Sequence, residues 1–114
     1  MHPIEITIRP YESPKDDAYI YSTWTRYAWF SPKEPIKTPK QKWFKEKAEE
    51  IKAILSPETV KVACFKDNPY VIAGYIVVHH SEITWICVKK DYRRQGIERL
   101  LMQSMKERLH GQEE

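Results

Sequence analysis

The 114-residue sequence is poor in cysteine, and its two cysteines form no cross-linking or metal-binding pattern. Cys64 and Cys87 lie in apolar runs that are typical of strands, whereas disulfide-stabilised folds usually carry more cysteines, placed in loops. No Cys-x-x-Cys or Cys/His spacing of the kind that binds zinc is present. We therefore expect two reduced, buried thiols and no metal site.

The sequence also lacks long hydrophobic runs and a strong net charge. A membrane-spanning helix needs about 18 or more apolar residues in succession, and no such run occurs. Residues 1–10 contain no signal-peptide core. The formal net charge is +3, far from the strongly basic balance of nucleic-acid-binding domains. We therefore expect a cytoplasmic protein without a membrane partner, and the net charge does not favour a nucleic-acid partner.

Apolar and charged residues occur in the proportions of a folded protein. The chain is 41% hydrophobic and 31% charged, and 12% of its residues are aromatic, which is typical of globular chains and not of disordered ones. A chain of this length usually folds as one domain that buries about two-thirds of its surface. We predict a single domain over residues 1–114.

The first half of the sequence predicts one strand and two helices. Residues 4–9 alternate between isoleucine and polar residues, which indicates a half-buried strand. A Ser-Pro-x-Asp pattern at 13–16 is a helix-start signal similar to a capping box, and this helix is expected to end at 27 or 28. A second Thr-Pro start at 38–39 predicts a helix that stops before Pro57.

The second predicted helix has two distinct faces. An apolar face is expected to be buried and consists of Trp43, Phe44, Ala48, Ile51, Ile54 and Leu55. A basic face carries Lys40, Lys42, Lys45 and Lys47. The basic face is either simply solvated or binds an anion or RNA, although no base-stacking motif accompanies it.

The second half of the sequence predicts three short strands and one helix. Residues 59–65, 70–79 and 82–88 are apolar runs joined by short turns, which is the pattern of an antiparallel meander. Residues 94–109 are amphipathic with helical period and precede Gly111, a good C-cap residue. The predicted fold class is α+β, with a four-stranded antiparallel sheet, three helices and the order β-α-α-β-β-β-α.

The junction between the last strand and the last helix is the best candidate for a binding site. A helix start presents N–H groups without intrahelical partners and the positive end of the macrodipole, so it binds phosphate readily. Gly96 would let a ligand approach the backbone, and Arg93 and Arg94 would add positive charge for a pyrophosphate. From these residues alone, a phosphate site and a chance arrangement both remain open.

The segment Arg93-x-x-Gly96-x-Glu98 resembles the motif Q/R-x-x-G-x-G/A of the GNAT N-acetyltransferase superfamily. The flanking residues agree as well, with an apolar strand before the motif, a tyrosine preceding the arginine and a leucine pair inside the helix. Residues 71–78 are similar to the third strand of the family, and the order of elements matches over the whole chain. The resemblance implies a GNAT-like fold, acetyl-coenzyme A as cosubstrate and an amine, on a small molecule or a protein, as acceptor.

The resemblance also implies roles for individual residues. The pyrophosphate would be held by Arg93, Arg94, Gln95, Gly96, Ile97 and Glu98, and the pantetheine arm by the strand backbone at Ile86, Cys87 and Val88. Glu82 heads the last strand eleven residues before Arg93 (93 − 82 = 11), where histone-type members carry a general base. The alternative for Glu82 is a solvated side chain beside a tight turn.

Other side chains near these positions have more than one interpretation. His79 and His80 either shuttle protons or form an exposed pair at a turn. Tyr92 matches the tyrosine that precedes the family motif, and we expect it to pack. Trp29 and Phe30, between the first two helices, either line the acceptor site or close the core.

Two features depart from the family pattern. The last motif position is Glu98 instead of glycine or alanine, and its carboxylate either repels the phosphates or merely complements the helix dipole. The sequence also stops after the pyrophosphate-binding helix, whereas full-length members add a strand, a helix and a hairpin. The tyrosine that often acts as general acid lies on that additional helix, so water or another group would have to protonate the leaving thiolate.

The function implied is the direct transfer of an acetyl group from acetyl-coenzyme A to an unidentified amine. The alternative is a non-catalytic GNAT-like module that binds a protein partner. In either case we expect the strand at 82–88 to be an exposed apolar edge, which favours pairing with a second copy or with a partner protein.

Overall fold

The computed structural model describes residues 5–32 and 34–110. These residues form, in chain order, β1 (Ile6–Pro10), α1 (Asp17–Phe30), α2 (Lys40–Ile54), β2 (Val60–Phe65), β3 (Asn68–His79), β4 (Glu82–Val88), the 3₁₀ turn η1 (Lys90–Tyr92), α3 (Ile97–Ser104) and α4 (Lys106–His110). The predicted α+β class is confirmed. None of the helices in these ranges is long and apolar enough to cross a membrane.

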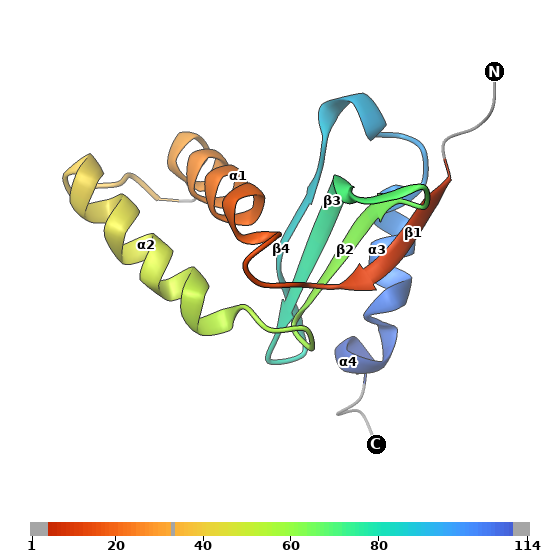
Figure 1. Ribbon diagram of the computed structural model, residues 1–114. Helices are drawn as coiled ribbons and strands as arrows, with labels where there is room; N and C mark the ends of the chain where they lie inside the picture. The colour runs from red at the N-terminus through yellow and green to blue at the C-terminus, as the bar shows by residue number, and fades with distance from the viewer. Residues whose placement is uncertain (1–4, 33, 111–114) are drawn as a thin grey trace.

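The four strands form one antiparallel sheet in the order β1-β2-β3-β4. Helices α1 and α2 lie on one side of this sheet and α3 lies on the other (Figure 1). Because successive strand residues point to opposite faces, the apolar residues of β2 and β3 divide into two cores, one under α1 and α2 and one under α3. The long apolar run of β3 is thus explained by burial on both faces.

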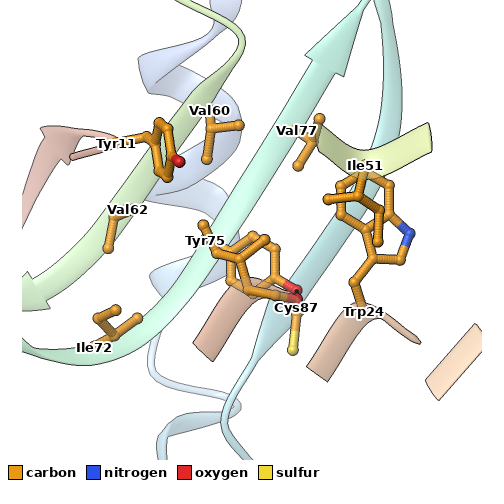
Figure 2. Packing of buried hydrophobic residues seen from close by; sticks show 10 residues of the cluster. Tyr11, Trp24, Ile51, Val60, Val62, Ile72, Tyr75, Val77 and Cys87 are labelled. Carbon is orange, nitrogen blue, oxygen red and sulfur yellow. Dashed lines mark hydrogen bonds between the residues drawn. The ribbon is translucent and has the colours of Figure 1, made fainter. Parts of the chain in front are cut away.

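The core under α1 and α2 combines aliphatic residues with aromatic side chains that carry a polar group (Figure 2). Trp24 stacks on Trp85 with ring centroids 5.7 Å apart. The Trp85 indole N–H donates to the Tyr75 hydroxyl at 3.2 Å, and this hydroxyl also bonds to Thr23 Oγ1 at 2.7 Å. These bonds satisfy buried polar groups, which would otherwise lack hydrogen-bond partners and cost free energy. Cys87 lies in this core, and both cysteines are buried and unbonded to one another, as predicted.

Helix α1 begins at Asp17, later than the start signal at 13–16 predicts. The carboxylate of Asp16 does not cap the helix but accepts two hydrogen bonds of 2.7 Å from the Arg9 guanidinium and one of 2.8 Å from the backbone N–H of Glu12. Residues 13–16 therefore form a turn that joins β1 to α1. The buried Arg9–Asp16 pair holds that turn in place.

Helix α2 is less buried than its amphipathic pattern predicts. Of the six residues expected on the apolar face, Ile51 is fully buried and the others are half-buried. The reason is that α2 packs mainly on α1, where Trp43 and Phe44 meet Trp29 with ring centroids 5.2 and 5.7 Å apart. Of the basic face, Lys47 is half-buried, and its amino group lies 5.8 Å from the centre of the Trp24 ring.

The last predicted helix begins three residues later than expected and is broken in two. Arg94 and Gly96 have φ angles of +66° and +81°, which no α-helix accommodates, so α3 starts at Ile97. The break falls at Met105, where the Ser104 hydroxyl donates to the Leu101 carbonyl at 2.6 Å and competes with the helical hydrogen bonds. The predicted cap at Gly111 lies outside the described residues.

Candidate active site

The start of α3 presents several backbone donors that the helix itself does not use. Gly96 is the N-cap residue, and no side chain caps this end. The Leu100 N–H is bonded to the Gly96 carbonyl, so the N–H groups of the three residues between them have no partner inside the helix. A Cβ atom at Gly96 would meet nothing within 4 Å. The glycine is thus required by its left-handed backbone, and the surface in front of it is open.

Arg93 is fixed at the end of β4 by its own side chain. Its Nε donates to the Val88 carbonyl at 3.0 Å, which places the guanidinium between the strand and the helix start. Arg94 is exposed. The side chain of Gln95 turns away from the helix start, because its amide donates to the Asp91 carbonyl at 3.3 Å. Gln95 therefore shapes the loop, while Arg93 supplies positive charge in front of the helix.

The outer edge of β4 carries backbone groups that point away from the sheet. Among the described residues, no strand pairs with this edge. The backbone N–H of Lys89 donates to the Ala73 carbonyl of β3 at 2.8 Å. Because bonded and non-bonded residue pairs alternate along an antiparallel ladder, Cys87 bonds inward to β3, whereas Ile86 and Val88 direct their backbone groups outward. At the open edge, Ile86 thus offers both of its backbone groups and Val88 offers its N–H, since the Val88 carbonyl already accepts a hydrogen bond from Arg93.

Two hollows meet at this junction. The strand hollow, of about 280 Å³, is lined by Tyr27, Trp85, Ile86, Cys87, Val88, Arg93 and Glu98. The loop hollow, of about 350 Å³, is lined by Val88, Tyr92, Arg93, Arg94, Gly96, Ile97 and Glu98. All the residues predicted to hold a ligand line one or both hollows, except Gln95. The structure therefore brings the predicted binding residues together along one continuous surface.

The Cys87 thiol faces the strand hollow but is not a candidate nucleophile. Burial raises the pKa of this thiol, and the nearby positive charge of Arg93 offsets only part of that effect. The thiol is therefore protonated at neutral pH, and the thiolate is the reactive form. Any group transfer at this surface would have to use a different nucleophile.

Glu82 lies apart from the two hollows. It is exposed at the start of β4, six residues or about 20 Å from Val88 along the strand. The pairing of β4 with β3 shifts between Ile83 and Trp85, so that Thr84 is an extra residue in a bulge. Without this bulge Glu82 and Trp85 would face opposite sides of the sheet; with it, both face α1 and α2.

The two histidines lie beside Glu82 at the turn between β3 and β4. His79 pairs with Glu82 across the hairpin and is half-buried, whereas His80 is exposed. Their ring centroids are 3.9 Å apart. His80 and Ser81 both have positive φ angles, as a tight two-residue hairpin requires. The predicted base and both alternative proton carriers thus lie at one end of β4. The N–H groups and the arginine that could bind a phosphate lie at the other end.

A family model described as an acetyltransferase (GNAT) domain matches residues 30–114 of this chain. The chain belongs to the GNAT family. Among solved structures, the GNAT fold of this chain is similar to the solution structure of apo-form YjaB from Escherichia coli, with a TM-score of 0.56 and 17% sequence identity. The match covers 89% of this chain and 64% of YjaB, so the chain spans about two-thirds of the length of that protein. A search of curated proteins found no match.

Two residues that line the strand hollow, Trp85 and Tyr27, are not among the binding residues predicted from the sequence. Trp85 is two residues from Cys87 and therefore shares its face of β4, a signal that the sequence contained. Tyr27 reaches the strand hollow from α1. Its position depends on how α1 docks against the sheet, and the aromatic pattern of that helix does not specify the docking.

Proposed function

We propose that this GNAT acetyltransferase uses acetyl-coenzyme A and transfers the acetyl group directly to an amine. The observation that carries the proposal is the uncapped start of α3 beside the open edge of β4, joined by two continuous hollows. The pyrophosphate would bind the N–H groups of α3 and Arg93. The amides of the pantetheine arm would bond to the outward backbone groups of Ile86 and Val88. In this arrangement, Cys87 contributes its side-chain surface to the strand hollow.

The residues of β4 suit this orientation of the cosubstrate. An arm that runs from Val88 toward Thr84 brings its thioester toward the end of the strand where Glu82 lies. The acceptor must lose a proton for its nitrogen to attack the thioester carbonyl. We assign that proton to Glu82, directly or through a water molecule. The carbon–sulfur bond then breaks, and the departing thiolate takes a proton from water.

A non-catalytic role in binding a protein is the second candidate. It is favoured by Glu98, an acidic residue that lines both hollows where phosphates would lie, and by the open edge of β4. Ile83, on that edge, is 39% exposed, and an unpaired strand edge readily pairs with another chain. We propose that two copies, or this chain and a partner protein, associate through residues 82–88, and that the protein acts in the cytoplasm.

Turnover separates the two candidates. Acetyl-coenzyme A is incubated with the protein and a panel of amines, and release of the coenzyme thiol and acetylation of each amine are followed together. We expect transfer to at least one amine, and we expect Arg93→Ala to lower kcat/KM about tenfold or more, because charge-assisted hydrogen bonds to the pyrophosphate are lost. Arg108→Ala, which removes a charge away from both hollows, is the matched control.

Light scattering tests the association. At high protein concentration we expect a mass above that of one chain, and a Thr84→Pro variant, which disrupts the edge at the bulge, should return the protein toward a monomer. A monomer at every concentration would contradict self-association. Acetyl-coenzyme A binding without transfer to any amine, together with association, would favour the non-catalytic role.

A further inference from the structure

Helices α1 and α2 pack on one another (Figure 1), and a groove lies between the second half of α1 and the start of α2. This helix groove has a volume of about 680 Å³ and is lined by Ser22, Thr25, Arg26, Phe30, Lys40, Gln41 and Phe44. None of these residues lines the strand hollow or the loop hollow. The helix groove is therefore a surface separate from the proposed cosubstrate site.

Two aromatic rings give the helix groove an apolar surface. Phe30, the last residue of α1, is 71% exposed, and Phe44 of α2 is half-buried. The Thr25 hydroxyl already donates to the Tyr21 carbonyl at 2.6 Å, so its proton is not available to a ligand. Aromatic residues are enriched in protein–protein interfaces. An exposed ring beside a second ring is thus suited to contact with the apolar side chain of a partner.

The helix groove is also positively charged. Arg26 and Lys40 are exposed, neither forms an ion pair with another described residue, and no acidic residue is among the described residues that line the groove. Residues 18–45 of the sequence contain six basic residues and one acidic residue. The first turn of α2 contains no acidic residue either, so the positive end of its macrodipole adds to this charge. The groove therefore attracts negatively charged partners.

We propose that the helix groove binds an acidic peptide segment of a partner protein. One large apolar side chain of the peptide packs against Phe30 and Phe44, and carboxylates on either side of it meet Arg26 and Lys40. A volume of several hundred Å³ is enough for a few side chains. The inference goes beyond the proposed function and does not depend on it.

A peptide suits the helix groove better than a single-stranded nucleic acid does. Nucleic-acid strands bind to successive aromatic rings on which their bases stack. The Lys40 amino group lies 5.9 Å from the centre of the Phe44 ring and at the same distance from that of Trp29, so it covers faces on which bases would have to stack. Phe30 alone among the residues lining the groove is an exposed ring.

The aromatic and basic residues have different parts in this recognition. Phe30 supplies most of the affinity, because covering its exposed ring removes a large apolar area from water. Arg26 and Lys40 select acidic over basic peptides and accelerate association. Because both charges are exposed, salt should weaken their contribution and leave that of Phe30 in place.

Selection from a phage-displayed library of short random peptides on the full chain tests this inference. We expect the selected sequences to carry acidic residues next to a large apolar residue. One selected peptide is then synthesised with a fluorescent label, and its Kd is measured by anisotropy. Phe30→Ala should weaken binding about tenfold or more. Arg26→Ala/Lys40→Ala should weaken it about tenfold at low salt and much less at about 0.5 M salt.

Two matched controls separate the groove from the rest of the surface. Tyr70→Ala removes another exposed aromatic ring, and Lys42→Ala/Lys45→Ala removes two exposed charges of α2 that do not line the groove. Both should bind the peptide within about twofold of the wild-type protein, since distant exposed charges are largely screened. Alanine is a good helix former, so we expect the helix variants to fold, and a melting curve of each checks this.

The other outcomes would overturn the inference. A selection that enriches no acidic sequence, or a peptide whose affinity is unchanged in Phe30→Ala and in Arg26→Ala/Lys40→Ala, would exclude the groove as a site for acidic peptides. Labelled RNA of mixed sequence that displaces the peptide and needs Arg26 and Lys40 would make the groove a nucleic-acid site. Loss of self-association in Phe30→Ala, measured by light scattering, would assign it to a second copy. Arg93→Ala should bind the peptide as the wild-type protein does, so failure of the proposed function would leave this inference standing.

Discussion

The Glu98→Ala substitution tests how the unusual last motif residue affects cosubstrate binding. Glu98 is exposed in the first turn of α3 and lines both the strand hollow and the loop hollow. A carboxylate about 5 Å from a phosphate charge repels it by roughly 1 kcal/mol in water and about 3 kcal/mol at an effective dielectric constant of 20. Because Glu98 is exposed, the value near 1 kcal/mol applies. Alanine should therefore tighten the binding of coenzyme A about fivefold.

The same substitution should lower the stability of the fold, although it strengthens binding. An acidic residue in the first helical turn complements the macrodipole and stabilises the helix by about 0.3–1 kcal/mol. The free Glu98→Ala protein should therefore melt slightly earlier, although it binds coenzyme A more tightly. A shift in melting temperature would mix the two effects. Binding should instead be measured by titration calorimetry.

Ionic strength gives this prediction a second test. The gain in affinity should shrink between low salt and about 0.5 M salt, because screening already weakens the repulsion in the parent protein. Glu98→Gln keeps the size of the side chain and should show most of the gain, while Glu107→Ala, outside the hollows, should show none. If the wild-type protein binds well and Glu98→Ala binds with the same affinity, the carboxylate points to solvent and the repulsion argument is wrong.

Three further predictions concern the proposed base, the Arg9–Asp16 pair and the buried Tyr11. Glu82→Gln should lower turnover about a hundredfold without changing coenzyme A affinity; a wild-type rate would transfer the role to water or the histidines. Asp16→Ala should lower the free energy of unfolding by about 3 kcal/mol, because it leaves the Arg9 charge without its buried partner. Urea denaturation would check this, with Glu5→Ala at the exposed Glu5–Lys66 pair as a control that costs less than about 1 kcal/mol. Burial and a hydrogen bond to Asp17 raise the pKa of Tyr11 to about 12, so the neutral form is favoured in the folded state. The stabilisation of the fold by neutral Tyr11 is complete below the unfolded pKa of about 10 and is lost as the pH rises toward 12. Tyr11→Phe should flatten that loss, and an unchanged pH profile would refute the assignment.

Local signals in the sequence predicted most of the fold. Strand β4 occupies the predicted range, because a two-residue turn and a change of hydrophobic period mark both of its ends. The sequence pattern predicts a start of α3 that is too early, since the left-handed conformations of Arg94 and Gly96 are set by the way the loop closes onto the Val88 carbonyl. The pattern of α2 also predicts deeper burial than the structure shows. An amphipathic pattern predicts which face of a helix packs, but not whether it meets a sheet or another helix.

The candidate site was predictable to a similar extent. The motif identified the loop from Arg93 to Glu98, and the structure places most of that loop around shared hollows. The direction of the Gln95 side chain depends on a hydrogen bond to Asp91, for which the motif carries no signal. The contribution of Tyr27 depends on tertiary packing. The side of the sheet that Glu82 faces depends on the bulge at Thr84. No residue type in that strand predicts a bulge.

The most direct test of the account is the titration of isotope-labelled protein with acetyl-coenzyme A, followed by the NMR signals of the backbone amides. If the cosubstrate binds as proposed, saturable shifts should concentrate on the outward amides of Ile86 and Val88 and on the amides from Gly96 to Arg99. The amides of α2, which lie on the other side of the sheet, should not move. An absence of saturable shifts at millimolar acetyl-coenzyme A, or shifts confined to α2, would contradict the central claim.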